Sequence, residues 1–217
     1  MQKYLAEFVG TFALVFCGTG AIVIDQQSGG VVTHVGVAIT FGLIVLAMIY
    51  TFGEVSGAHL NPAVTLGFSA LGLFPAKEIA PYLGSQTAGA FLASGLLRFL
   101  FPTSQNLGAT LPAGPDIQSF VLEIVLTFLL MLVIIRVSQG AKETGWFAGI
   151  AIGSVVGLEA MFAGPICGAS MNPARSLAPA IVSGNVSQVW IYLAAPVLGT
   201  LLAVFIAKTV FLKIHHS

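Results

Sequence analysis

Charged residues are scarce in this 217-residue chain: they make up 7% of it, against about 25% in an ordinary soluble domain. Eight Lys/Arg balance eight Asp/Glu, and 57% of the residues are hydrophobic. So few charges cannot cover a water-facing surface, so we expect a membrane protein with nearly all of its residues in or against the bilayer. The apolar content excludes an intrinsically disordered chain, and the lack of a basic patch argues against nucleic-acid binding.

Cysteine is equally rare, and motifs for catalysis are missing. Cys17 and Cys167 lie in apolar surroundings without metal-ligand spacing, so we interpret both as small packing residues. The sequence contains no phosphate-binding loop, metal-ligand cluster or nucleophile–base pair at a useful spacing. We therefore expect neither an enzyme nor a protein with a cofactor or a metal site.

Several apolar stretches are long enough to cross a hydrocarbon core about 30 Å thick, which takes about 20 helical residues. They lie at 4–24, 33–53, 79–101, 118–138, 146–164 and 189–211. The first resembles a signal peptide, but Glu7 interrupts its apolar core, and we expect it to be retained as a span. Two further stretches, 61–70 and 172–183, reach only about 15 Å, which is half of the core.

The two halves of the chain repeat each other. The segment GAHLNPA beginning at Gly57 matches GASMNPA beginning at Gly168, and matches in the same order join the spans of the two halves. Each half holds three long spans, an odd number, so the repeats, about 1–105 and about 115–217, enter the membrane from opposite sides. We therefore expect a single all-α channel domain over 1–217, with six transmembrane helices and two re-entrant half-helices in two inverted repeats.

Basic residues set the predicted orientation. Lys3, Lys77, Lys142 and Lys213 map to one side of this topology, which the positive-inside rule makes the cytoplasmic side. Arg98 maps to the other side and is the exception. We expect both termini in the cytoplasm and the protein in the inner or plasma membrane of the cell.

Each short stretch opens with an Asn-Pro-Ala box. The boxes are Asn61-Pro62-Ala63 and Asn172-Pro173-Ala174. Asn is a strong N-cap residue and Pro is favoured at the first helical position, so each box predicts a helix start. Two N-termini facing each other at the midplane would each contribute about half a positive charge and repel cations, including hydronium. With both asparagine amides donating to a passing water, that water cannot accept a proton from its neighbour, and proton hopping stops.

Ionisable residues inside the predicted spans carry the next expectations. A charge there costs about 2.5–3.5 kcal/mol on insertion scales. Glu7 and Glu123 occupy matched spans, and we expect them to accept N–H bonds from the loops that lead into the half-helices. The alternatives are a carboxylate near the headgroups or a proton relay. Arg175 stands where the first repeat has Val64, and we expect it to face the pore and bind solutes; a lipid-exposed structural Arg is the alternative.

The sequence leaves two possible roles open for each of two further residues. His59 precedes the first box and either touches the cytoplasmic mouth of the pore or makes a structural hydrogen bond. Glu159 either lines the outer vestibule or marks a solvated end of a span.

Taken together, the two boxes, the Arg after the second box and the Glu in spans one and four resemble the aquaporin (major intrinsic protein) family over essentially the whole chain. The resemblance implies a homotetramer with a pore in each protomer. It also implies a narrow filter at four positions, which are Phe41, Ala160, Ala169 and Arg175. The run 163–176 is most similar to nodulin-26-like proteins and their bacterial relatives, whose members pass water, glycerol or undissociated metalloid acids.

The filter residues fit neither common pattern of the family. Strict water channels usually have His at the place of Ala160, and glycerol facilitators usually pair two aromatics with a Gly and follow the Arg with Asp. Here only Phe41 is aromatic and Ser176 follows the Arg. Two alanines predict a filter wider than that of a water-only channel. We expect passive passage of water and small uncharged polar solutes, namely glycerol-like polyols or undissociated metalloid acids, with protons and ions excluded.

Three alternatives remain open from the sequence. A water-selective aquaporin would pass none of the larger solutes. A proton-coupled carrier would use Glu7, Glu123 or Glu159, because inverted repeats are also a transporter architecture. A structural or adhesive membrane protein would have a closed pore.

Overall fold

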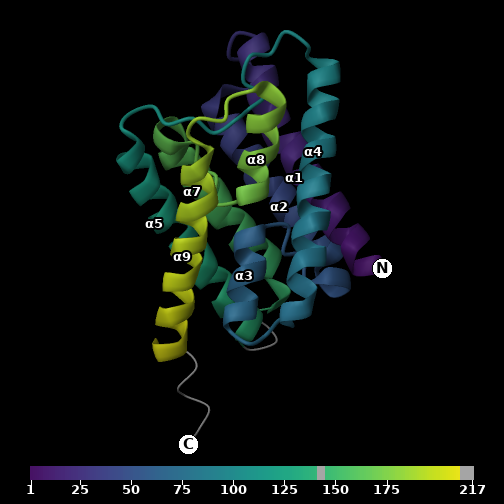
Figure 1. Cartoon of the computed structure of the whole chain (residues 1–217), viewed down its shortest axis with the longest axis vertical. Coiled ribbons are helices and arrows are strands. Elements are labelled where there is room, and N and C mark those ends of the chain that lie inside the picture. The colour runs from purple at the N-terminus through teal and green to yellow at the C-terminus, as the bar shows by residue number, and fades with distance from the viewer. Residues whose placement is uncertain (141–144, 211–217) are drawn as a thin grey trace, which may run out of the picture.

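The computed structural model describes residues 1–140 and 145–210, which form helices and connecting loops and contain no strand. Lys142 and Lys213, two of the lysines that predict the orientation, lie outside these residues. The elements are α1 (Gln2–Gln27), α2 (Thr33–Ser56), α3 (Pro62–Ala70), η1 (Ala76–Glu78), α4 (Ile79–Leu100), α5 (Asp116–Gln139), α7 (Ala148–Cys167), α8 (Pro173–Ser183) and α9 (Val189–Val210) (Figure 1).

The long helices fall where the apolar stretches predict them, with ends that shift by a few residues. Five of them, α1, α2, α5, α7 and α9, are long and apolar enough to cross a membrane. The sixth expected span, α4, has 22 residues but is more polar than the others, since it carries Gln86, Ser94 and Arg98. Gln86 and Ser94 are fully buried among the other helices, so α4 hides these polar groups inside the protein.

The helices pack in matched pairs. α1 lies along α4 and α5 lies along α9, while α2 and α7 join the two halves. A Cβ atom at Gly89 of α4 would collide with the carbonyl oxygen of Phe8, and one at Gly199 of α9 would collide with that of Ile124. Small residues let helix backbones approach closely in membranes. The two halves therefore use equivalent glycines for equivalent helix contacts.

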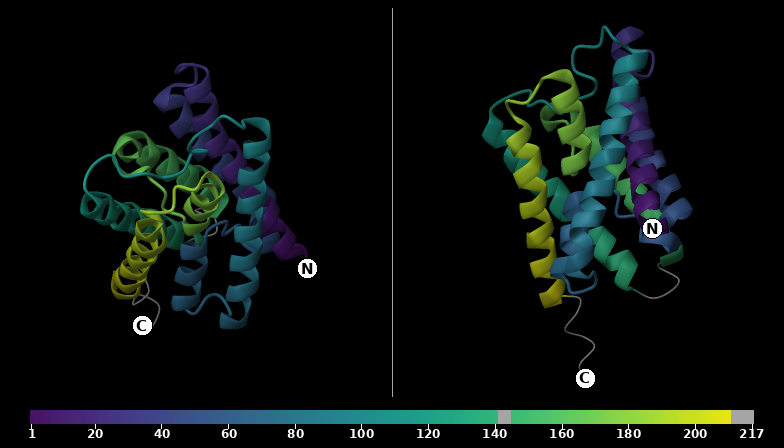
Figure 2. Two further views of the ribbon diagram at one scale, coloured as in Figure 1. Left: turned by 45° about the horizontal axis from the view of Figure 1, so that its top comes forward. Right: turned by 45° about the vertical axis from the view of Figure 1, so that its right-hand side comes forward.

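The half-helices α3 and α8 begin in the middle of the molecule and run in opposite directions (Figures 1 and 2). They have 9 and 11 residues, or roughly 14–17 Å at 1.5 Å per residue. The expected all-α fold, with re-entrant half-helices in two inverted repeats, is confirmed.

Candidate functional site

The two asparagines cap the half-helices as their sequence context predicts. Asn61 Oδ1 accepts the N–H of Ala63 at 2.9 Å. Asn172 Oδ1 accepts the N–H groups of Ala174 at 3.0 Å and Arg175 at 3.3 Å. Each asparagine has an extended backbone and is followed by Pro at the first helical position. Both helix starts therefore point their free N–H groups toward the centre of the molecule.

The asparagine amides also link the two halves to each other. Asn61 Nδ2 donates to the carbonyl oxygen of Met171 at 2.7 Å, and Asn172 Nδ2 donates to that of Leu60 at 2.9 Å. A side-chain amide has two N–H groups. The sequence predicts that both are free for water, whereas the structure commits one per asparagine to the opposite loop. One N–H of each asparagine remains for a passing oxygen.

The loops that lead into the half-helices have an uncommon backbone. Ala58 and Leu60 have φ of +46° and +52°, and the matched Ala169 and Met171 have +40° and +53°. Residues other than glycine rarely adopt this left-handed region, and such strain persists only where surrounding contacts fix it. The same strain at matched places in both loops indicates that the extended path into each half-helix is imposed from outside the loop.

The two buried glutamates impose this path. Glu7 accepts the backbone N–H groups of His59 at 2.9 Å and Leu60 at 2.7 Å. Glu123 accepts those of Ser170 at 2.7 Å and Met171 at 2.8 Å. Both carboxylates are fully buried, one in α1 and one in α5. Each thus supplies acceptors for loop N–H groups that would otherwise be unsatisfied at membrane depth.

The four expected filter residues line one cavity of about 750 Å³, which also contains both asparagines. Arg175 is only 2% exposed, and its Nη1 donates to the carbonyl oxygen of Gly108 at 2.9 Å. Its guanidinium carbon lies 5.0 Å from the ring centroid of Phe41, within the range of a cation–π contact. Ala160 and Ala169 line the same cavity with small side chains.

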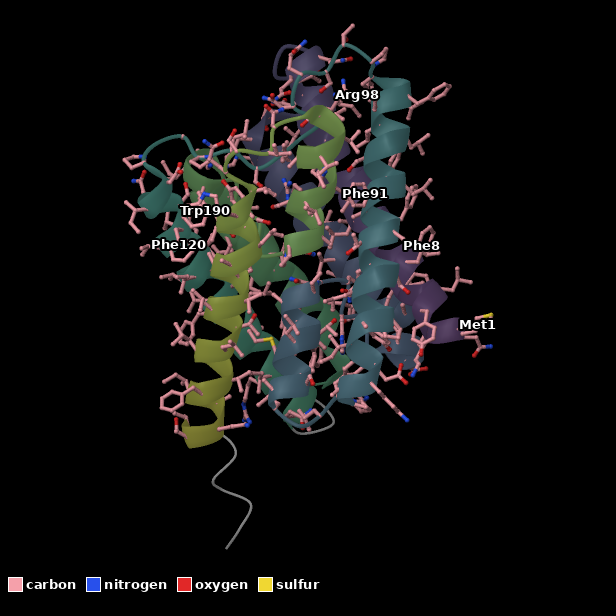
Figure 3. The ribbon with its side chains drawn as sticks, viewed as in Figure 1. Met1, Phe8, Phe91, Arg98, Phe120 and Trp190 are labelled. Carbon is pink, nitrogen blue, oxygen red and sulfur yellow. The ribbon has the colours of Figure 1, made fainter. Side chains whose placement is uncertain are left out.

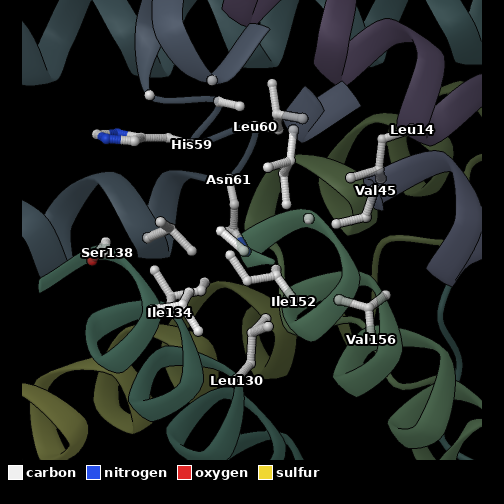
Figure 4. A pocket seen from close by; sticks show the side chains of 18 of the residues that line it. Leu14, Val45, His59, Leu60, Asn61, Leu130, Ile134, Ser138, Ile152 and Val156 are labelled. Atoms are coloured by element: carbon white, nitrogen blue, oxygen red, sulfur yellow. The ribbon is translucent and has the colours of Figure 1, made fainter. Parts of the chain in front are cut away.

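The rest of the cavity wall is mostly apolar. Figure 4 shows Leu130, Ile134, Ile152 and Val156 around the space below Asn61. Such a wall offers water few hydrogen bonds, and Asn61, Asn172 and Arg175 are among its polar side chains.

The family model described as Major intrinsic protein matches residues 1–207. The chain belongs to the major intrinsic protein family. It is 46% identical to Aquaporin NIP1-3 of Oryza sativa subsp. japonica, over 91% of this chain and 70% of that protein. It is 43% identical to Nodulin-26 of Glycine max, over 97% of this chain and 78% of that protein. The expected likeness to nodulin-26-like proteins is therefore confirmed.

A solved structure agrees with this assignment. The X-ray structure of the aquaglyceroporin from Plasmodium falciparum matches with a TM-score of 0.85 and 28% identity, covering 98% of this chain and 97% of that one. This major intrinsic protein is thus a multi-pass membrane channel for passive transport of water or small solutes, and it is not an enzyme.

His59 makes the structural hydrogen bond of one interpretation and also lies in the cavity wall, while its place at the cytoplasmic mouth stays a prediction. It lines the cavity, and its Nδ1 lies 3.1 Å from Thr65 Oγ1. Its ring stacks on Phe68 with centroids 4.8 Å apart and contacts Phe74 and Tyr82. The aromatic contacts fix the ring beside the pore.

Glu159 matches neither interpretation. It is 1% exposed, so the expectation of a solvated span end is wrong. It is not among the residues lining the cavity, which argues against the outer vestibule as well. Neither carboxylate oxygen has a hydrogen-bond partner within residues 1–140 and 145–210. The structure therefore leaves a buried carboxyl outside the cavity wall, one residue before Ala160 in the sequence.

Two residues of this site escape prediction from the sequence. Gln86 Nε2 donates to Glu7 Oε2 at 2.7 Å and to Thr65 Oγ1 at 3.0 Å. The sequence did offer a signal for Gln86, since it is a polar residue inside an apolar span. Gly108 contributes only its carbonyl oxygen, to Arg175, and a loop glycine gives no comparable sequence signal.

Proposed function

We propose that this channel passes water and small uncharged polar solutes, such as glycerol-like polyols or undissociated metalloid acids. The filter composition carries the proposal. Arg175 presents N–H donors to hydroxyl groups, and Phe41 presents an apolar face to the carbon side of a solute. Ala160 and Ala169 leave room that a bulkier pair would fill.

We further propose that protons and ions are excluded in two places. Two helix N-termini meet at the asparagines, and their partial positive charges oppose cations. Each asparagine keeps one N–H for a passing water, which holds the water oxygen as an acceptor. Arg175 adds a full positive charge at the filter, in a site that is almost closed to bulk water.

Orientation and assembly are part of the same proposal: both termini in the cytoplasm, a homotetramer, and the inner or plasma membrane of the cell. Lys3 Nζ lies 2.9 Å from Glu78 Oε2, next to Lys77, so these lysines share one end of the bundle. Lys208 lies at the C-terminal end of α3, also on this end. Arg98 lies at the opposite end (Figure 3). The tetramer rests on the family resemblance.

Stopped-flow light scattering of proteoliposomes tests the filter. Water, glycerol, urea and boric acid permeabilities are compared for the wild type, Ala160→His and Ala160→Val. Both variants should narrow the pore and lower glycerol flux severalfold more than water flux. His adds bulk and a donor and Val adds bulk alone, so the pair separates size from hydrogen bonding. Solute flux undiminished in both variants would show that Ala160 does not line the constriction.

The same measurements address the alternatives. A water-selective aquaporin would give water flux alone, and a closed pore would give nothing above empty vesicles. A proton-coupled carrier would accumulate solute against its gradient when a pH gradient is imposed. The structure disfavours the carrier, because Glu7 and Glu123 already hold the pore loops.

A further inference from the structure

Two cations contact the C-terminal ends of the half-helices from matched places. Lys208 Nζ donates to the carbonyl oxygen of Ala70, the last residue of α3, at 2.9 Å. Arg98 Nη2 donates to that of Val182, in the last turn of α8, at 3.4 Å. Arg98 and Lys208 have the same separation in the sequence as the matched glycines of α4 and α9. The duplicated fold therefore holds one cation for each half-helix.

A cation is favourable at the C-terminal end of a helix. The last carbonyl groups of a helix have no partner within the helix, and they form the negative end of its dipole. A cation there satisfies a carbonyl and complements the dipole. Arg98 is the one exception to the distribution of basic residues that predicts the orientation. Its contact with the C-terminal end of α8 accounts for a basic residue on the side opposite to the lysines.

Arg98 makes a second set of contacts that Lys208 lacks within the described part of the chain. Its Nη1 donates to the carbonyl oxygens of Ser104 at 2.7 Å and Pro102 at 3.3 Å. Both belong to the loop that follows α4. The same guanidinium thus joins this loop to the C-terminal end of α8.

The loop continues directly to the filter. Gly108, four residues after Ser104, accepts Arg175 Nη1 at 2.9 Å. Between them Leu107 is fully buried, and its N–H donates to Ser104 Oγ at 3.2 Å. Asn185, just after α8, donates to the Gln105 carbonyl oxygen at 3.2 Å. These contacts hold the loop between Ser104 and Gly108, so a displacement of Ser104 should also move the Gly108 carbonyl.

We propose that Arg98 is a positioning residue of the filter, which fixes the Gly108 carbonyl and α8 and thereby the direction of the Arg175 guanidinium. The inference rests on the proposed role of Arg175 in solute selection. Lys208 contacts α3 at the other end of the bundle from this loop, so it provides a matched comparison.

The test compares the ratio of glycerol to water permeability in proteoliposomes, per reconstituted protein. Arg98→Gln should change this ratio at least threefold, because Arg175 loses its fixed direction. Arg98→Lys keeps the charge with fewer donors and should restore the ratio partway. Lys208→Gln should leave the ratio unaltered even where both fluxes fall together, and the exposed Lys77→Gln controls for loss of one charge.

A purely structural role for Arg98 would lower both permeabilities in parallel and keep the ratio, and that result overturns the proposal. If Arg98→Gln does not reconstitute, Asn185→Ala loosens the same loop from α8 and must itself shift the ratio for the proposal to stand. Ala160→His is measured alongside. If the permeability ratio shifts in Ala160→His but not in the Arg98 variants, only the positioning role of Arg98 is refuted. If the ratio shifts in neither, the filter assignment is refuted as well.

Discussion

Gly89 is the position where the packing of this bundle can be tested most directly. Its backbone lies so close to α1 that an added Cβ would overlap the carbonyl oxygen of Phe8 and lie 3.1 Å from the backbone N of Phe12. Neither atom belongs to a flexible side chain, so Gly89→Ala must push α1 and α4 apart. Overpacking of this kind costs about 1–3 kcal/mol.

The same helix contains matched controls. A methyl group added at Gly84 or Gly95 would have nothing within 4 Å of it, and both glycines are exposed. Alanine there should stabilise α4 by about 0.5–1 kcal/mol, because glycine is the poorer helix former. The propensity gain is equal at Gly89, so the difference between Gly89→Ala and Gly84→Ala isolates the contact. We expect this difference to be about 1–3 kcal/mol.

Thermal unfolding of the purified protein in detergent measures this difference. For a chain of this size 1 kcal/mol shifts Tm by about 2–4 °C. Gly89→Ala should therefore melt about 2–12 °C below Gly84→Ala. Gly84→Ala and Gly95→Ala should raise Tm slightly, and Gly199→Ala should behave like Gly89→Ala. The reasoning is refuted if Gly89→Ala melts at or above Gly84→Ala.

Two further predictions concern buried carboxyl groups. Glu7→Gln replaces an oxygen that accepts two donors with an NH₂ group, so water permeability should fall at least fivefold. The control is Asp116→Asn, at an exposed residue outside the cavity wall. Equal permeability in both variants would contradict the role of Glu7 in holding the loop. Glu159→Leu should raise Tm by a few degrees, because it replaces a buried carboxyl that has no partner in the described residues with an apolar side chain. A lower Tm would show instead that this carboxyl is hydrated and needed.

Much of this fold follows from sequence because the relevant signals are repeated. The two Asn-Pro boxes predict helix starts, and capping chemistry requires little more than Asn and Pro in succession. Span lengths follow from bilayer thickness, so even α4 is found despite its polar residues. Glu7 and Glu123 stand out because a charge inside a span needs a reason.

Other parts of the site had no such signal. The bond from Asn61 Nδ2 to the Met171 carbonyl crosses between halves, and backbone acceptors carry no residue identity. The Gly108 carbonyl is hidden for the same reason. The prediction for Glu159 was wrong because its place near the end of a span does not show whether its side chain faces solvent or the protein interior.

Comparison of the two halves separates scaffold from selectivity. Where both repeats keep equivalent contacts, as at Glu7 and Glu123 or Gly89 and Gly199, the contact shapes the loops or the helix packing and serves both halves alike. The proposed constriction is not symmetric, because its cation has no counterpart in the first half. Arg175, in the place of Val64, supplies it. The unmatched contacts around Arg175, above all those of its supporting loop, are therefore where differences in solute preference should arise.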